Sequence, residues 1–400
     1  MRIAGIIAEY DPFHKGHAAH IAATRAENGG NATHIVAVIS GNFTQRGEPA
    51  LLSKFVRAEM ALAAGADLVL ELPLPWAMAP AENFAAGGVA ILKALSCVDF
   101  ISFGSECGDT DTLKTLAALS ETSAYQIALK ENLAAGLPYA AASQTAATSI
   151  VGEEAATALA SPNNTLGIEY LRAVARQEAN FDAFTLLRQG ALHNDNAPNQ
   201  GFASASLIRS LLLDGNVGKA TEFMPSETAS LLKDAISTGV APSNKTILQD
   251  TIPTLMRRMT PEQFSALPWL SEGLENRLYA VSRTATTYND LLDQLKTRRY
   301  PMARLRRVIW SAVLGLTSED TNGLPPYIRV LGMNARGREI LSVAKPTLPL
   351  LTRTAQLDEL DERCHRVFEL ECTATDLHAL TRPVPAPCGT DHTHKLCIKA

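Results

Sequence analysis

The sequence predicts an α/β protein in which a doubly wound, Rossmann-like parallel sheet is followed by a mainly helical second half. Continuous apolar runs that suit buried parallel strands alternate with stretches of helical periodicity up to residue 105. From Ser206 to about Trp310, helical runs are separated by Pro and Gly. The 400 residues also exceed the roughly 100 to 200 of one domain. We therefore expect two domains, residues 1–200 and 201–400.

Four strands are expected early in the first domain, each a short apolar run bounded by polar or turn residues. They span residues 2–8, 34–40, 67–72 and 98–103. Helices are expected between them, including one over 53–64 that ends before Gly65, a residue typical of a helix C-terminus. This alternation predicts right-handed crossovers and a ligand site beyond the carboxyl ends of the strands.

The rest of the first domain is expected to be mainly helical over residues 109–180, with one more strand over 184–187. The stretch 189–202 is rich in Gly, Asn and Pro. Such composition predicts an active-site loop or a hinge.

Composition excludes several classes of protein. Hydrophobic residues make up 46% and charged residues 19%, which is typical of a globular chain and not of a disordered one. No apolar run reaches the roughly 20 residues of a membrane helix, and the run Ile3–Ala8 is too short for a secretory signal. None of the six cysteines forms a Cys-x-x-Cys pair. We expect a cytoplasmic protein that does not enter a membrane.

Four cysteines and four histidines gather near the C-terminus, at Cys364, Cys372, Cys388, Cys397, His365, His378, His392 and His394. Their gaps match no compact zinc spacing. We expect free thiols in an ordinary helix and tail, and no metal site.

The two halves differ in charge. Residues 1–200 hold 12 basic and 20 acidic side chains, whereas residues 201–400 hold 24 and 21. One acid-free stretch concentrates six cations around Tyr300, namely Lys296, Arg298, Arg299, Arg304, Arg306 and Arg307. Such a cluster predicts a surface for the phosphates of a nucleic acid, and Arg329, Arg336 and Arg338 add cations downstream. The alternative is a solvated helix face.

The first strand runs into a pair of histidines around a glycine, His14-Lys15-Gly16-His17. A strand that gives way to a helix N-terminus presents backbone N–H groups to phosphate. Gly16 allows a nucleotide to approach closely, and His14 and His17 can donate to the α-phosphate as charge develops. The pattern predicts attack on the α-phosphorus with release of pyrophosphate. The alternative is a pair of solvent-facing histidines.

Five blocks, in order along the first half, carry a more specific pattern: Gly5–His17, Ser40–Ala50, Ala64–Pro73, Phe103–Glu106 and Pro162–Tyr170. The histidine motif resembles the His-x-Gly-His signature of the nucleotidyltransferase superfamily, and the five blocks together resemble the bacterial tRNA(Met) cytidine acetate ligase family. The likeness weakens beyond them and continues to about residue 380. It departs at Asp11 and Lys15, where the family pattern has Asn; Lys15 would add a cation beside the phosphates.

The resemblance implies that ATP contacts the segment from the end of the first strand through the next helix, at Ile7, Ala8, Glu9, Tyr10, Asp11, Pro12, Phe13, His14, Lys15, Gly16, His17, Ala18, Ala19 and His20. It also implies nucleotide contacts by Gly104, by Asn163 or Asn164, and by Arg188. A turn glycine, a helix cap and a solvated arginine are the alternatives for these positions.

The stretch Ser204–Arg209 opens a helix in which Ser204 or Ser206 suits the N-cap. In the superfamily that the sequence resembles, a similar Ser/Thr-rich stretch ending in Ile-Arg holds the β- and γ-phosphates. We therefore expect Ser204, Ser206 and Arg209 at the phosphates, with Arg209 catalytic beside His14 and His17. Arg46 and Lys54 are candidates for acetate or pyrophosphate, because an arginine fork suits a carboxylate; solvated loop cations are the alternative.

The resemblance implies an ATP-dependent ligase, with Mg²⁺ as part of the ATP complex. Acetate would attack the α-phosphate to give acetyl-adenylate and pyrophosphate, and the acetyl group would pass to N4 of the wobble cytidine, C34, of elongator tRNA(Met). Two other functions stay open: a metabolic nucleotidyltransferase that joins ATP to a small phosphorylated cofactor precursor, and a nucleotide-binding regulator without turnover.

Overall fold

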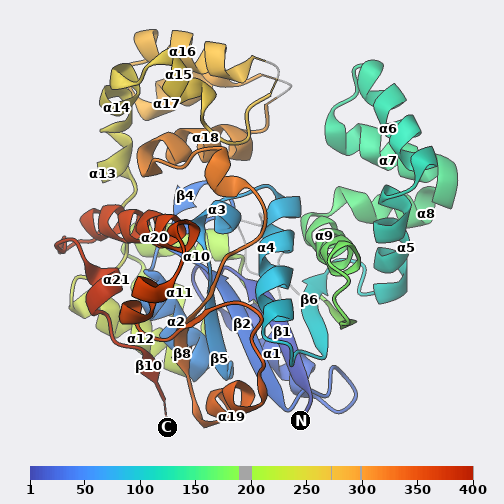
Figure 1. Cartoon of the computed structure of the whole chain (residues 1–400), viewed down its shortest axis with the longest axis vertical. Helices are drawn as coiled ribbons and strands as arrows, with labels where there is room; N and C mark the ends of the chain where they lie inside the picture. The colour runs from blue at the N-terminus through green and yellow to red at the C-terminus, as the bar shows by residue number, and fades with distance from the viewer. Residues whose placement is uncertain (189–200, 272, 298–299, 400) are drawn as a thin grey trace.

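The computed structural model describes residues 1–188, 201–271, 273–297 and 300–399, and at its centre lies a mainly parallel sheet with helices on both faces (Figure 1). The strands run in the order β10-β8-β5-β2-β1-β6-β7, with β9 beside β8. Their bounds are β1 Ile3–Ala8, β2 His34–Ser40, β5 Leu68–Leu72, β6 Phe100–Ser105, β7 Asp182–Leu187, β8 Ile328–Met333, β9 Leu350–Leu351 and β10 Cys397–Ile398. A separate ribbon pairs β3 (Phe43–Thr44) with β4 (Glu48–Pro49).

The parallel strands β5-β2-β1-β6-β7 form the doubly wound sheet that the sequence predicts. The chain moves from β1 outward to β2 and β5, and then crosses back to β6 on the other side of β1. The order of the strands therefore reverses between β1 and β6. In doubly wound folds this switch point, at the carboxyl ends of the strands, is where ligands bind.

Both faces of the central strands are buried because successive side chains point to opposite sides. Ile3 and Ile7 belong to one apolar core, while Ala4 and Ile6 belong to another. The first core lies under α4 and α9, and the second under α1, α2 and α12. These helices are α1 Lys15–Arg25, α2 Lys54–Ala63, α4 Ala81–Ala94, α9 Pro162–Arg176 and α12 Ser226–Ser237. The helix predicted over 53–64 is α2, and Gly65 follows it at φ 109°.

The second half of the chain also contributes strands to this sheet. The sheet therefore does not end at residue 200, where the sequence predicts the boundary between the two domains. β8 pairs antiparallel with β5, and β9 and β10 pair with β8. The sequence of β8, IRVLGM, is a continuous buried apolar run of the same kind as β1 and β2. The sheet is therefore completed by residues more than 250 positions downstream of β5.

Two groups of helices stand away from the sheet (Figure 1). The first follows β6 and comprises α5 Thr110–Ser120, α6 Ser123–Ala134, α7 Tyr139–Val151 and α8 Glu153–Ala156. The second, here called the upper lobe, comprises α13 Thr246–Gln249, α14 Ile252–Arg258, α15 Pro261–Ser265, α16 Leu274–Thr284, α17 Tyr288–Leu295 and α18 Met302–Leu314. An apolar core surrounds Trp310 in the upper lobe, and Phe43, Leu74 and Met78 from the first half of the chain belong to it as well.

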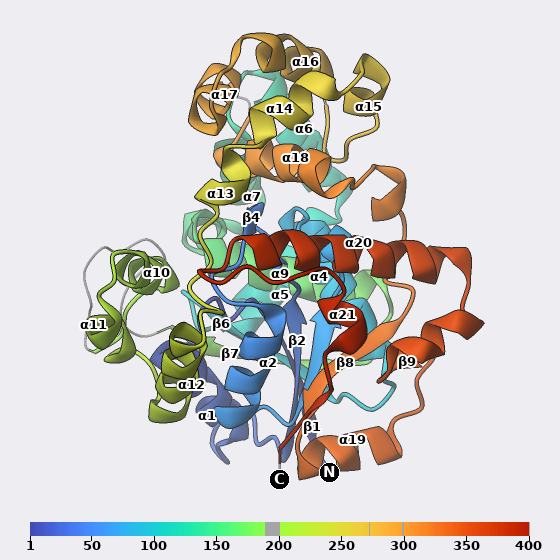
Figure 2. The same ribbon diagram turned by 90° about the vertical axis from the view of Figure 1, so that its left-hand side faces the viewer.

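The remaining helices link these parts. They are α3 Leu74–Ala77, α10 Ala205–Leu213, α11 Val217–Thr221, α19 Ala335–Val343, α20 Glu362–Leu380 and α21 Thr390–Thr393. Figure 2 shows α20 lying across the molecule between the sheet and the upper lobe, and its Leu370 and Ala374 join the core of that lobe.

Within the described ranges, no three His, Cys, Asp or Glu side chains are grouped so as to hold a metal ion. In the C-terminal region the contact between Cys372 Sγ and His392 Nε2 measures 3.5 Å. A helix long and apolar enough to cross a membrane is also absent from the part of the chain that the structure describes.

Candidate active site

A cavity of about 220 Å³ lies at the switch point between β1 and β6. Its wall includes most of the residues that the sequence singles out: Ile7, Ala8, Glu9, Tyr10, Asp11, His14, His17, His20, Arg46, Gly104, Asn163, Arg188, Ser204, Ser206 and Arg209. An adjoining cavity of about 270 Å³ shares the three histidines and adds Gly16 and Ala19. Segments more than 190 residues apart in sequence therefore meet where the fold places a ligand.

The two histidines of the motif form the first turn of α1. Their rings stack, with centroids 3.7 Å apart and planes 19° apart. His14 caps the helix, because its Nδ1 accepts a hydrogen bond from Gly16 N–H at 3.0 Å, and His17 Nδ1 accepts one from His14 N–H at 3.3 Å. A neutral imidazole that accepts at Nδ1 carries its proton on Nε2. Both rings therefore keep an Nε2–H donor for a phosphate oxygen.

Burial keeps these rings neutral. Burial, with smaller effects from Arg188 and Arg209, lowers the pKa of His14 to about 3. Burial also lowers the pKa of His17 well below its ordinary value, and that of His20 to about 4. The site thus offers uncharged N–H donors beside the arginines, and these donors persist at neutral pH.

This arrangement predicts that stability falls in mild acid. The folded-state pKa values of His14 and of the buried His378 are both about 3, below 6.5, so the unfolded chain takes up protons that the folded chain excludes. The free energy of unfolding should fall from about pH 6.5 toward pH 3, by about 1.4 kcal/mol per histidine at pH 5.5. Denaturant titrations at pH 7.5 and 5.5 measure it. His378→Asn should reduce this pH dependence, and an unchanged dependence would contradict the assignment.

Arg209 reaches the site from α10 and is oriented by the chain after β1. Its Nη1 donates to the carbonyl oxygen of Asp11 at 2.6 Å and lies 3.8 Å from Asp11 Oδ2. Asp11 in turn accepts the Leu51 N–H at 2.8 Å. Ser204 caps α10 by accepting the Leu207 N–H at 3.1 Å. The helix that begins in the Ser-rich stretch therefore points its N-terminus and Arg209 at the same cavity as His14.

The nucleotide candidates near β6 separate into two kinds. Gly104, Asn163 and Arg188 line the cavity, whereas Asn164 is buried and supports the turn after β6 by accepting from the N–H groups of Glu106 and Cys107. Asn163 donates to Glu106 Oε1 at 2.6 Å. Of the two asparagines that the sequence left open, Asn163 is the one at the cavity.

Several predicted contacts do not lie at the cavity. Pro12, Phe13 and Ala18 are absent from its wall, and Phe13 is a fully buried ring behind Tyr10 and His17. Lys15 is exposed on the first turn of α1 and lines neither cavity, so it does not place a cation beside the site. A helix directs consecutive side chains around its axis, so only some residues of a continuous motif can face one ligand.

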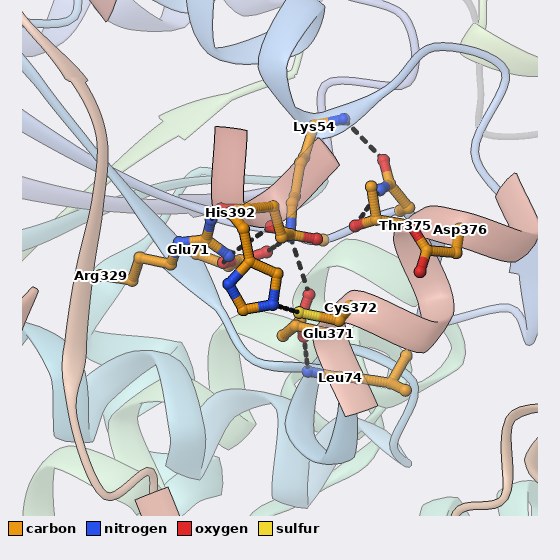
Figure 3. A network of polar contacts seen from close by, with 12 residues as sticks. Lys54, Glu71, Leu74, Arg329, Glu371, Cys372, Thr375, Asp376 and His392 are labelled. Carbon is orange, nitrogen blue, oxygen red and sulfur yellow. Dashed lines mark hydrogen bonds and ion pairs between the residues drawn. The ribbon is translucent and has the colours of Figure 1, made fainter. Parts of the chain in front are cut away.

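Lys54 is also placed differently from the prediction. Its side chain is fully buried, and its Nζ lies 2.6 Å from Glu71 Oε1 and 3.2 Å from Glu371 Oε2 (Figure 3). Asp391 Oδ1 lies 2.8 Å from the same Nζ. Arg329 completes this buried ionic network through Glu71 and Asp391. Lys54 therefore has three structural partners and is not available to a substrate. Sequence periodicity could not show this, because two of the partners lie more than 300 positions away.

The predicted basic cluster is spread over several environments. Arg298 and Arg299 lie outside the described residues. Lys296 is exposed, Arg304 donates to Trp269 O and Ser271 Oγ, and Arg307 donates to Gln45 O. Arg306 pairs with Glu48 at 3.1 Å. The described members are thus not one uniform solvated helix face, and two of them contact the loop that carries Arg46.

The cavity also contains residues that the motifs did not single out: Ile6, Gln45, Phe84, Phe103, Leu166, Tyr170 and Ala205. The backbone N–H of Gln45 donates to Glu9 Oε1 at 2.7 Å, and the Tyr170 hydroxyl donates to Ile7 O at 3.4 Å. Gln45 and Tyr170 lie inside the blocks 40–50 and 162–170, so those blocks were the available signal. Phe103 opens the block 103–106, whereas Phe84 lies in none of the five blocks and has no signal of this kind in the sequence.

Comparisons with known proteins show the family of this chain. A family model described as HIGH Nucleotidyl Transferase matches residues 1–390. A tRNA(Met) cytidine acetate ligase of Acetivibrio thermocellus is 38% identical, with both chains covered completely, and one of Caldanaerobacter subterraneus is 37% identical over 95% of each chain. Among solved structures, Thermotoga maritima TmcAL bound with alpha-thio ATP superposes with a TM-score of 0.91 at 32% identity, with 100% of both chains covered. The apo form of that protein gives a TM-score of 0.92 at 32% identity over 100% of this chain and 99% of the other. The chain therefore belongs to the tRNA(Met) cytidine acetate ligase family of HIGH nucleotidyl transferases.

Proposed function

We propose that this protein activates acetate with ATP and transfers the acetyl group to N4 of the wobble cytidine, C34, of elongator tRNA(Met). The observation that supports it most is the stacked pair His14 and His17, whose Nε2–H donors stand at a helix N-terminus on the wall of the switch-point cavity. The names of the relatives supply the substrates, and the ATP analogue bound to the Thermotoga protein supplies the nucleotide.

In the first step, an acetate oxygen attacks the α-phosphorus, a P–O bond to acetate forms, and the bond to the departing pyrophosphate breaks. A carboxylate nucleophile needs no general base. His14, His17, Arg209 and the N-termini of α1 and α10 would stabilise the charge that develops on the phosphate oxygens. Arg46, which lines the same cavity, suits the acetate carboxylate or the pyrophosphate.

Magnesium would enter as the ATP complex. Mg²⁺ that is bound to a nucleotide is held largely by the phosphate oxygens and by the water molecules that it keeps. When bound, the ion would neutralise charge on the phosphates.

The direct test measures two half-reactions of the protein. Acetate-dependent exchange of pyrophosphate into ATP should be observed, and labelled acetate should be transferred to tRNA(Met). The matched control is the same tRNA with uridine in place of cytidine 34, which should accept no acetyl group. Exchange that depends on phosphopantetheine or nicotinate mononucleotide, and not on acetate, would favour a metabolic nucleotidyltransferase instead.

The cations near the upper lobe are expected to bind the tRNA backbone. Lys296, which is exposed, and Arg306, which pairs with Glu48, are both replaced by alanine. The double variant should bind tRNA(Met) more weakly, and the slope of log K against log salt should fall by about 0.7 to 0.9 per lost phosphate contact. Lys233→Ala, which removes an exposed lysine of α12, is the control. A salt slope equal to that of the control would show that Lys296 and Arg306 make no contact with the tRNA phosphates.

A further inference from the structure

A third, smaller cavity adjoins the switch-point cavity on the side of the upper lobe. Its volume is about 130 Å³, and Glu9, Asp11, Arg46 and Arg209 line both cavities. The remaining wall comes from the β3–β4 ribbon, the end of α10 and the start of α13: Thr44, Glu48, Pro49, Leu51, Leu213, Ser243, Asn244, Lys245 and Thr246. A molecule bound there would contact the same four side chains as a molecule in the switch-point cavity.

We propose that this third cavity receives the acceptor base, and that Glu9 at the junction accepts the hydrogen bond and then the proton of the reacting amine. The inference rests on the proposed function and adds to it the place where the cytosine enters. We call the cavity the acceptor pocket.

The size of the acceptor pocket suits one flipped base. The volume of about 130 Å³ is far above the roughly 10 to 15 Å³ that a single water molecule requires, so the pocket can admit a group larger than solvent. Enzymes that act on a base extrude it from its stack into such a pocket, and this costs least in a single-stranded loop.

The polar groups of the wall match the edge of cytosine. The N4 amine is a donor, and carboxylates are its usual protein partners. Glu9 Oε1 already accepts the Gln45 N–H at 2.7 Å, which fixes the carboxylate between the two cavities. Arg46 and Arg209 supply donors for the acceptor atoms N3 and O2 of the base.

The rim carries cations that suit the phosphate of the same nucleotide. Lys245 Nζ lies 2.7 Å from Glu48 Oε2, and Arg306 Nη1 lies 3.1 Å from Glu48 Oε1. One carboxylate thus holds a lysine and an arginine from two parts of the upper lobe at the edge of the pocket. These are the side chains that contact nucleic-acid backbones, and they place the tRNA on the lobe side of the site.

The transfer step balances within this arrangement. N4 attacks the carbonyl carbon of acetyl-adenylate, the N–C bond forms, and the C–O bond to AMP breaks. AMP leaves with the electron pair, and one N4 proton passes to Glu9, which returns it to solvent. Burial, with a contribution from Asp11, raises the pKa of Glu9, so this carboxylate is a stronger base than an exposed one.

A plug in the acceptor pocket tests the proposal. Thr246 is exposed and lines the pocket, whereas its neighbour Ile247 is 46% exposed and does not line it. Thr246→Trp should keep acetate-dependent pyrophosphate exchange within about twofold of the parent protein and lower acetyl transfer to tRNA(Met) at least tenfold. Ile247→Trp, the matched control, should keep both activities.

The outcomes separate the inference from the function on which it rests. Equal transfer by the two Trp variants, or loss of exchange or a raised KM for acetate in Thr246→Trp, would overturn the acceptor pocket. A parent protein that exchanges pyrophosphate but acetylates no tRNA would overturn the proposed function instead.

A second variant tests Glu9 itself. Supplied with preformed acetyl-adenylate, Glu9→Gln should transfer acetyl to tRNA about 10² to 10⁴ times more slowly in a single turnover, as is typical when a general base is lost. Transfer at the parental rate would show that Glu9 does not accept the proton in this step.

Discussion

Replacing His14 or His17 by alanine is expected to lower acetate-dependent pyrophosphate exchange by about 10²- to 10³-fold, or about 2.7 to 4 kcal/mol of barrier. Each variant removes one Nε2–H donor that burial keeps neutral and that backbone N–H groups hold in one tautomer. Because the donors are oriented before ATP binds, their loss should act on the rate of adenylation more than on the affinity for ATP.

The control is His365→Ala, which removes a histidine of α20 far from the cavity in sequence and outside its wall. Circular dichroism should show the same helix content in all variants. A folded His14→Ala/His17→Ala double variant with near-normal exchange would end the catalytic assignment.

Replacing Lys54 by alanine is expected to lower the free energy of unfolding by about 3 to 5 kcal/mol, since one partner of a buried ion pair is removed. The variant would leave Glu71, Glu371 and Asp391 buried with Arg329 as their one remaining cation in the network of Figure 3. Chemical denaturation followed by circular dichroism measures the change.

Glu371→Gln is the matched control, since burial and the neighbouring Glu71 raise the pKa of Glu371 well above its ordinary value. Burial opposes the charged form of Glu71 as well, but Lys54 and Arg329 hold its pKa below the ordinary value. Of the two glutamates, Glu371 is therefore the one whose surroundings favour the protonated form, and an uncharged amide should replace it at much smaller cost. A loss as large as that of Lys54→Ala would mean that Glu371 is ionised.

The sequence predicts many of the residues that line this cavity, but it does not predict the long-range strand pairings that complete the sheet. The His-x-Gly-His turn and β1 are contiguous, so their local pattern contains the whole geometric unit: strand, turn, helix N-terminus. Asn163 and Asn164 show the limit of such patterns, because only the packing of α9 against β6 decides which side chain reaches the cavity.

Lys54 shows a different limit. A cation at the start of a helix resembles a substrate ligand in sequence, and its partners Glu371 and Asp391 come from elements that no short-range periodicity connects to α2. The same holds for β8, whose apolar run is visible in sequence but whose neighbour β5 is not. Pairings over such separations are set by the global fold and not by local propensity.

The position of β8 has a consequence for how the protein forms during synthesis. When β1 to β7 have left the ribosome, β5 is still an edge strand with unpaired N–H and C=O groups, and Glu71 at its end lacks Arg329. Closing that edge requires residues 328–333, and completing the ionic network requires Asp391. The edge of β5 therefore stays open while more than 250 further residues are translated, about 140 of them after β7. In this state, pairing with another chain competes with folding.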